Sequence, residues 1–215
     1  MPAPRPTTIL LVRHGQTPTT GKHLPGRTPG LHLSDRGRAE AEATARRIAA
    51  LPKVDAVYAS PLERTRETAA PIAAARHVKV KAHRGLLECD YGEWTGAELK
   101  KLRKLPEWKV IQQHPSGFRF PGGESLAGMQ TRFVQTLHDL AGEHRGGVVV
   151  AVSHADPIRA AVADALGSHL DMFQRVVVGT ASVTAIAYGE LGPAVLAVNA
   201  YGDLTQLGAK VDGKQ

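Results

Sequence analysis

The stretch TILLVRHGQT, residues 8–17, decides the fold that we predict for this chain of 215 residues. Its apolar residues 9–12 have the length and composition typical of a strand that is buried on both faces of a parallel sheet. Arg13 and His14 follow at the carboxyl end of this strand, where ligands bind in open α/β sheets. Because a guanidinium can bind phosphate through two hydrogen bonds, the pair predicts an anion site.

The overall composition predicts a soluble, cytoplasmic protein with a normal core. Hydrophobic residues make up 42% of the chain, and no run reaches the roughly 18 apolar residues that a membrane span needs, so we expect no membrane partner. The single cysteine, Cys89, cannot form an internal disulfide, which agrees with a reducing compartment.

The net charge of +7 at pH 7 favours anionic partners, which include phosphorylated metabolites and nucleic acids. The basic residues are dispersed and aromatic residues amount to 5%, so base stacking is poorly supplied and we expect no nucleic-acid partner. The 10 histidines show no zinc-site spacing and no second cysteine is available, so we expect neither a metal nor a cofactor.

Hydrophobic periodicity predicts an α/β fold: three α/β/α layers around a mostly parallel sheet, with at least one antiparallel strand and a small helical cap. The expected strands are residues 9–12, 54–59, 78–82, 148–153, 176–178, 182–188 and 194–200. The expected long helices begin near residues 35, 61, 126 and 155.

Capping signals indicate where helices begin. Ser34 is expected to cap the first helix, and Ser60 the second, with Pro61 at its first position. Thr95 and Glu98 are spaced as a capping box for a short further helix.

We expect a single domain over residues 1–215, with residues 95–122 as a cap or lid insertion. Within the cap, Pro106 is expected to end the short helix, and residues 109–121 to form a lid or loop near the site entrance. Residues 205–215 are polar and contain glycine, which predicts a flexible tail.

RHGQT, residues 13–17, resembles the RHG motif of the histidine phosphatase superfamily, whose members include cofactor-dependent phosphoglycerate mutases and broad-specificity phosphatases. The histidine of that motif takes the phosphoryl group, so the resemblance implies that His14 is the nucleophile. SPLERTRETA, residues 60–69, is similar to the second signature, S-x-x-x-R-T-x-x-T-A, which implies that Arg64 is a phosphate ligand.

LLECDYGEWTG, residues 86–96, matches the family element L-x-E-x-x-x-G-x-W-x-G and implies that Glu88 is the general acid. SHADPIR, residues 153–159, is similar to the second-histidine motif S-H-G-x-x-I/L-R, which implies that His154 is the second histidine of the site. Ala155 replaces the glycine, and its N–H at a helix start can still face an anion. Asp156 is less usual there and either weakens the positive field of His154 or orients it.

The chemistry of phosphate esters supports the same assignments independently. Without a metal, hydrolysis needs a nucleophile, groups that neutralise the phosphoryl oxygens and an acid for the leaving alkoxide. A neutral His14, held by a backbone carbonyl at one ring nitrogen, attacks through the other. Arg13, Arg64 and His154 neutralise charge, and Glu88 donates the proton.

Two loops depart from the family pattern, which leaves the remaining substrate contacts open. Many relatives carry a tryptophan and a phosphate-binding asparagine where this chain has Thr19 and Thr20. Thr20, Gln16 and Thr17 are the candidate substrate-binding residues in that loop. Arg27 is expected to contact the part of the substrate other than phosphate.

These observations predict a metal-independent phosphomonoesterase that acts on a small phosphorylated metabolite through a phosphohistidine. A phosphoglycerate mutase shares every residue named above, and a catalytically weak regulatory protein that binds a phosphorylated ligand is a further alternative. The short segment between Glu88 and residue 122 favours the phosphatase, because a mutase must enclose its intermediate. The oligomeric state and the natural substrate stay open.

Overall fold

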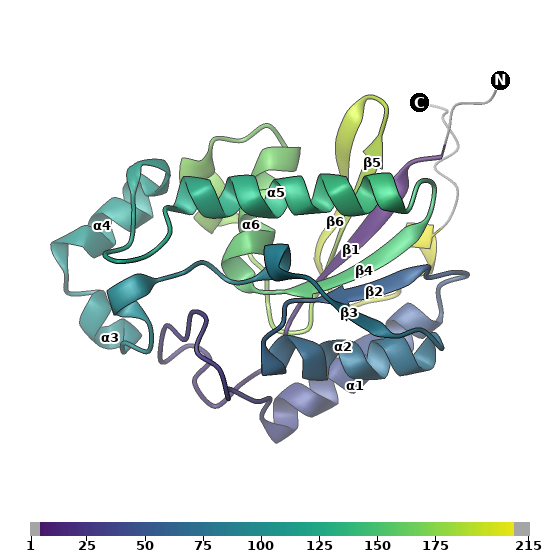
Figure 1. The fold of residues 1–215 in the computed structure, drawn as a ribbon, viewed down its shortest axis with the longest axis horizontal. Coiled ribbons are helices and arrows are strands. Elements are labelled where there is room, and N and C mark those ends of the chain that lie inside the picture. Colours follow the sequence, from purple (N-terminus) through teal and green to yellow (C-terminus); the bar gives the residue numbers. More distant parts are fainter. Residues whose placement is uncertain (1–4, 209–215) are drawn as a thin grey trace.

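The computed structural model describes residues 5–208 and has the predicted three-layer α/β/α architecture (Figure 1). The strands β1 to β6 are Thr7–Arg13, Ala56–Ala59, Val80–Ala82, Val148–Ser153, Val183–Gly189 and Gly192–Ala200. The helices α1 to α6 are Asp35–Ala49, Glu63–Ala75, Leu99–Leu102, Pro106–Gln113, Leu126–Glu143 and Ala155–Ala165.

The six strands form one sheet in the order β3-β2-β4-β1-β5-β6. The first four of these are mutually parallel, whereas β5 is antiparallel to both β1 and β6. The expectation of a mostly parallel sheet with an antiparallel addition is therefore confirmed. β1 lies inside the sheet, and its residues 9–12 are completely buried, as their uniformly apolar sequence predicts.

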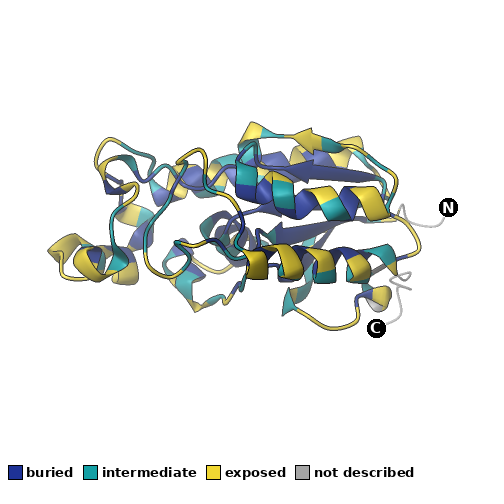
Figure 2. Ribbon diagram, turned by 90° about the horizontal axis from the view of Figure 1, so that it is seen from below, coloured by how far each residue is buried: buried dark blue, intermediate teal, exposed yellow. Residues whose placement is uncertain are grey.

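Helices cover both faces of the sheet, with α5 and α6 on one face and α1 and α2 on the other (Figure 1). Phe133 and Leu137 of α5 pack on the first face, and Ile48 of α1 and Ile72 of α2 pack on the second. Figure 2 shows the central strands buried between helices whose outward residues are exposed. This burial of apolar surface on both faces fixes the strand ends that carry the candidate site.

The second helix begins later than predicted. The N-cap of α2 is Leu62, so Ser60 does not cap the helix and Pro61 does not occupy its first position. The Ser60 hydroxyl is hydrogen-bonded to His154 Nε2 at 3.0 Å. Because this tertiary contact engages the hydroxyl, the capping prediction was wrong.

The cap contains more helix than predicted. Thr95 and Glu98 form no capping box: Glu98 is the N-cap of α3 without a side-chain capping bond, and its carboxylate pairs with Lys101 at 2.8 Å. Pro106 begins α4 instead of ending a helix, and α4 occupies part of the expected loop 109–121. Proline fits the first helical turn because its missing N–H would have no helical partner there.

Residues 176–178 form no strand, contrary to prediction. They follow a 3-10 helix, Leu170–Arg175, and the Val178 carbonyl accepts a hydrogen bond from Arg13 Nη1 at 2.7 Å. The Val178 carbonyl is therefore bonded to the Arg13 side chain and takes no part in a β-ladder. At the C-terminus, Thr205–Gly208 form a 3-10 helix, and the rest of the expected tail, 209–215, lies outside the described residues.

Gly37 in α1 supports the turn after β1 by close backbone approach, since a Cβ at this position would come within 2.0 Å of the Gln16 carbonyl oxygen. We expect Gly37→Ala to lower the free energy of unfolding by about 1–3 kcal/mol, because the crowded backbone must move. Urea unfolding measures this change. The displacement of Gln16, two residues from His14, should also disturb the turn that positions His14.

Gly142→Ala is the matched control. Gly142 is exposed near the end of α5, and nothing lies within 4 Å of an added Cβ. Alanine should therefore raise the free energy of unfolding by about 0.5–1 kcal/mol. Equal effects of the two substitutions would contradict the proposed role of the close approach at Gly37.

Candidate active site

Two arginine and two histidine side chains converge at the carboxyl edge of the sheet. Arg13 ends β1, His14 follows it, Arg64 lies in the first turn of α2, and His154 is the N-cap of α6. Arg13 is opposite Ser153 in the parallel pairing of β1 with β4. This register makes the two histidines that follow neighbours, with ring centroids 5.3 Å apart.

His14 is a neutral imidazole with one nitrogen free of a proton. Its Nδ1–H donates to the Gly15 carbonyl oxygen at 2.8 Å, because a carbonyl can only accept, and this is the hydrogen bond expected from the sequence. Burial, followed by the charges of Arg64 and Arg13, lowers the pKa of His14 to about 3. Nε2 is therefore unprotonated at neutral pH and suited to nucleophilic attack.

The two arginines carry buried N–H groups that the protein does not satisfy. The completely buried Arg64 donates from Nη2 to the Gly26 carbonyl at 2.6 Å, but its Nε and Nη1 have no hydrogen-bond partner. Arg13 Nε likewise has none. Burial lowers the pKa of both guanidinium groups, but arginine keeps its charge at physiological pH. A buried cation with free donors fits an anion that has several acceptor oxygens.

His154 is also neutral and completely buried. Its Nδ1 lies 3.4 Å from Arg64 Nη2, which can only donate, so Nε2–H donates to Ser60 Oγ at 3.0 Å. Burial, then the charge of Arg64, lowers the pKa of His154 well below its usual value. Burial and Arg64 therefore disfavour the protonated form of His154, whose charge we expected from the sequence to help neutralise phosphate.

Glu88 enters the same region as a protonated carboxyl. Its Oε1 accepts the Cys89 N–H at 3.0 Å, and its carbonyl accepts hydrogen bonds from Arg27 Nε at 2.9 Å and Arg132 Nη2 at 3.4 Å. Burial, followed by the negative charge of Asp156, raises the pKa of Glu88 to about 8. The side chain therefore holds a proton at neutral pH, which a general acid requires.

A cavity of about 400 Å³ opens beside these groups and is lined by Arg13, His14 and Glu88. Its outer wall comes from the cap, through Trp108 and Ile111 among others. Gln174 Nε2 donates to the Ile111 carbonyl at 3.1 Å and ties α4 to the 3-10 helix on the other side of the cavity. The volume and mixed lining suit a small metabolite.

Three of the less specific predicted contacts lie on the cavity wall. Thr17, Thr20 and Ala155 line it, and the Thr17 and Thr20 hydroxyls are 3.0 Å apart. Ala155 is the first residue of α6, so its N–H belongs to the helix start that favours anions.

Among the predicted site residues, Gln16, Arg27, Arg64 and His154 do not line the cavity, but Arg64 and His154 are completely buried next to His14, which does. Gln16 Oε1 accepts a hydrogen bond from Ser34 Oγ at 3.1 Å. Arg27 Nη2 pairs with Glu124 at 2.9 Å, and its Nη1 lies 3.5 Å from Asp90. The structure therefore gives the side chains of Gln16 and Arg27 partners outside the cavity, and Arg27 supports the acid-bearing segment instead of facing a substrate.

Tyr91 and Arg159 line the cavity, although the sequence did not identify them as site residues. The Tyr91 hydroxyl donates to Asp156 Oδ2 at 2.8 Å, and Arg159 Nη1 pairs with Asp156 Oδ1 at 3.2 Å. The spacing of three between Asp156 and Arg159 indicates a shared helix face and was a usable signal. Tyr91 carried no such signal, because its contact joins distant parts of the chain.

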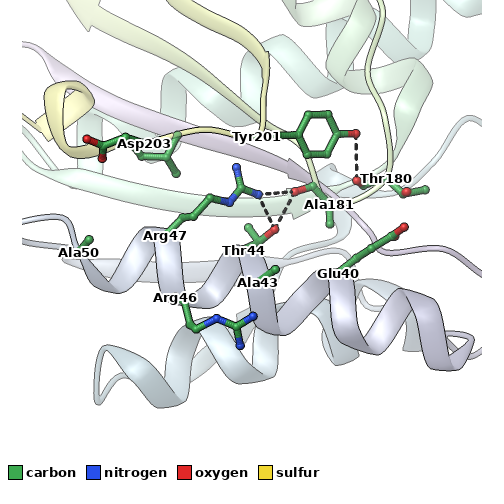
Figure 3. Close-up of a pocket in the computed structure, with 11 residues that line it drawn as sticks. Glu40, Ala43, Thr44, Arg46, Arg47, Ala50, Thr180, Ala181, Tyr201 and Asp203 are labelled. Atoms are coloured by element: carbon green, nitrogen blue, oxygen red, sulfur yellow. Dashed lines mark hydrogen bonds between the residues drawn. The ribbon is translucent and has the colours of Figure 1, made fainter.

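A second cavity, of about 460 Å³, lies between α1 and the segments that carry Ala181 and Tyr201 (Figure 3). Arg47 Nη2 donates to the Thr44 hydroxyl at 2.7 Å and to the Ala181 carbonyl at 3.1 Å. The residues that line this second cavity include neither histidine nor cysteine. Since the protein already satisfies Arg47, the chemistry favours the first cavity.

Within residues 5–208, no three His, Cys, Asp or Glu side chains gather in a way that would hold a metal ion. The helices of this described part are too short or too polar to cross a bilayer.

Comparisons with known proteins agree with this geometry. The model of the histidine phosphatase superfamily (branch 1) matches residues 9–201. Phosphoserine phosphatase 1 of Hydrogenobacter thermophilus is 33% identical over 196 residues, which cover 89% of this chain and 91% of that protein. A 2,3-bisphosphoglycerate-dependent phosphoglycerate mutase of Mesorhizobium japonicum is 33% identical over 165 residues, 72% of this chain and 79% of the mutase.

Among solved structures, a mutant phosphoserine phosphatase from Entamoeba histolytica in complex with phosphoserine superimposes with a TM-score of 0.81 at 26% identity. The match covers 91% of this chain and 98% of that one. The fold and the sequence comparison thus identify the same group of proteins.

The unsatisfied donors of Arg64 predict separate effects on stability and anion binding. Arg64→Met should leave the free energy of unfolding unchanged or raise it by up to about 4 kcal/mol, because an apolar side chain removes a buried charge. The same substitution should abolish the increase in melting temperature that inorganic phosphate gives the parent protein. Thermal unfolding with and without phosphate measures both effects.

Arg66→Met is the matched control, since Arg66 is exposed on the same helix. This variant should keep the full phosphate-induced increase. If Arg64→Met kept that increase as well, Arg64 would not be a phosphate ligand.

Proposed function

The chain belongs to the histidine phosphatase superfamily, and from its site geometry we propose that it hydrolyses a small phosphorylated metabolite through a phosphohistidine at His14. The observation that carries the proposal is the free Nε2 of a neutral His14 beside two buried guanidinium groups with unused donors. Similarity to a phosphoserine phosphatase supports a small substrate.

In the first step, the phosphate of the ester binds to the free N–H groups of Arg13 and Arg64. His14 Nε2 then forms a bond to phosphorus while the bond from phosphorus to the ester oxygen breaks. Glu88 transfers its proton to that oxygen and the alcohol leaves. The arginines stabilise the charge that spreads over the phosphoryl oxygens during transfer.

In the second step, water replaces the alcohol. Glu88, now a carboxylate, takes a proton from the water as its oxygen attacks phosphorus, and the bond to His14 Nε2 breaks. Inorganic phosphate leaves and Glu88 regains its proton, so the cycle is balanced. The neutral His154 is hydrogen-bonded to Ser60 and to Arg64, and through these contacts it holds the Arg64 guanidinium in place during both steps.

The mutase alternative uses the same side chains and differs in how well the cap excludes water. The cap consists of two short helices, α3 and α4, and residue Arg103 between them is exposed. Arg103 also lines the cavity, so the cavity reaches the surface at the cap, and entry of water there favours hydrolysis over return of the phosphoryl group.

With 3-phosphoglycerate and 2,3-bisphosphoglycerate in one reaction, we expect release of inorganic phosphate to exceed interconversion of the 2- and 3-isomers. Phosphate assay and isomer-resolved NMR in the same tube measure both. His14→Ala should abolish turnover and the 80-dalton phosphoenzyme adduct that mass spectrometry detects, since no covalent route remains. EDTA should have no effect.

Each other outcome would select a different function. Dominant interconversion would identify a mutase, and phosphate binding without turnover on any ester would identify a binding protein. Turnover of His14→Ala near the parent rate would rule out the phosphohistidine.

The raised pKa of Glu88 sets the expected pH dependence. Because the acid form is needed and the pKa is about 8, kcat/KM should hold through neutral pH and fall as the pH rises through about 8. Glu88→Gln should reduce kcat by roughly 10²–10⁴ for alkyl phosphates, but much less for p-nitrophenyl phosphate, whose leaving group needs no proton. Equal losses on both ester types would argue against Glu88 as the acid.

A further inference from the structure

We propose that Asp156 is a positioning residue for Glu88: through the Tyr91 hydroxyl it fixes the acid-bearing segment against α6, and it places a second carboxylate in the cavity that the Glu88 carboxyl lines. The inference rests on the proposed role of Glu88 as the acid. It assigns a task to a carboxylate that takes no direct part in the two steps above.

The first part of the argument is the tether. Tyr91 lies three residues after Glu88 and is almost fully buried, and its hydroxyl donates to Asp156 Oδ2 at 2.8 Å. Asp156 is the second residue of α6, whose N-cap is His154. The hydrogen bond thus connects the segment that carries the acid to the helix that carries one wall of the phosphate pocket.

The rest of this segment is held by its backbone. The Glu88 carbonyl accepts hydrogen bonds from Arg27 Nε and from Arg132 Nη2 of α5. These contacts fix where the Glu88 main chain lies but do not join it to α6. Tyr91 and Asp156 supply that link.

The second part of the argument is the balance of charge around the Glu88 carboxyl. Arg13 of β1 and Arg64 of α2 face it with positive charge and favour its ionised form. The Cys89 N–H also favours the ionised form. Asp156 supplies the negative charge that opposes them, and it adds to the effect of burial on the pKa of Glu88.

Arg132 also lies near Glu88, but its guanidinium pairs with Glu124 at 2.9 Å, as that of Arg27 does. These ion pairs leave Asp156 as a carboxylate that lines the cavity together with Glu88. Asp156 is itself compensated from the other side by Arg159 Nη1 at 3.2 Å. Two carboxyl groups that share a cavity in this way divide the roles of proton donor and fixed charge between them.

The test is a direct titration of Glu88 that does not depend on turnover. Protein labelled with carbon-13 at the glutamate side-chain carboxyls is followed by NMR from pH 4 to pH 10, and Glu88→Gln identifies the resonance. Asp156→Asn keeps an acceptor for the Tyr91 hydroxyl but removes the charge. We expect the Glu88 midpoint to move to lower pH by on the order of one unit.

Two further variants complete the design. Arg159→Met removes the positive charge that compensates Asp156, so the midpoint should move to higher pH. Unfolding of the two variants could not move the Glu88 midpoint to lower pH in Asp156→Asn and to higher pH in Arg159→Met. Asp164→Asn is the matched control, because this exposed carboxylate on α6 undergoes the same change of charge and should leave the midpoint unchanged.

Kinetics then test the two parts of the proposal separately. In Asp156→Asn, the alkaline limb of kcat/KM for an alkyl phosphate should move by the same amount as the NMR midpoint, with little change for p-nitrophenyl phosphate. Tyr91→Phe keeps the charge and removes the tether, so it should lower kcat several-fold for the alkyl phosphate and less for p-nitrophenyl phosphate, without moving that limb to lower pH.

An unchanged Glu88 midpoint in Asp156→Asn would overturn the electrostatic part, and an unchanged kcat in Tyr91→Phe would overturn the tether. If the midpoints move as expected but no ester is hydrolysed, the proposed function fails while the control of the Glu88 proton stands. If esters are hydrolysed but the midpoint does not respond, only the inference about Asp156 fails.

Discussion

The structure depends on the burial of positive charge that has no ion-pair partner within residues 5–208. Arg64 is completely enclosed, yet two of its nitrogens lack a hydrogen-bond partner, and Arg13 beside it has the same deficit at Nε. A buried unpaired charge costs several kcal/mol, so the surrounding fold must supply that free energy. Uniformly apolar strands and helices on both faces of the sheet provide it. The site is thus organised for an anion before one arrives.

The same positive charge determines the state of both histidines. Near Arg64 and Arg13, and out of contact with water, an imidazole cannot readily take a second proton, so His14 and His154 are neutral. For His14 this state is useful, because the Gly15 carbonyl holds the proton on Nδ1 and leaves Nε2 available. The nucleophile is therefore prepared by the environment of the phosphate group itself, without a separate base.

Two carboxyl groups line the same cavity as Arg13 and His14. Glu88 and Asp156 both line it, but Glu88 is buried and protonated, whereas Asp156 accepts hydrogen bonds from Tyr91 and Arg159. A proton donor and a fixed charge can therefore lie close together without both being ionised.

The sequence by itself determined the layers of the fold and nominated the residues that we propose for phosphate binding. Strand β1 could be read from its four apolar residues, which put Arg13 at a strand end, whereas Arg64, Glu88 and His154 were identified by the resemblance of their motifs to those of the family. Local signals of this kind depend only on neighbours in the chain. They also correctly indicated Ser34 as a helix cap, where its hydroxyl accepts the Gly37 N–H.

Only the tertiary structure decided the contacts between distant segments. Ser60 has the local features of a helix cap, but its hydroxyl is bonded to His154, which lies 94 residues away in the sequence. Arg27 was expected to contact a substrate but pairs with Glu124, and Tyr91 reaches Asp156 from another element. The choice among such partners depends on which side chains the packing brings within hydrogen-bond distance. The protonation states of His14 and Glu88 followed in the same way, because burial and opposing charges exist only once the chain has folded.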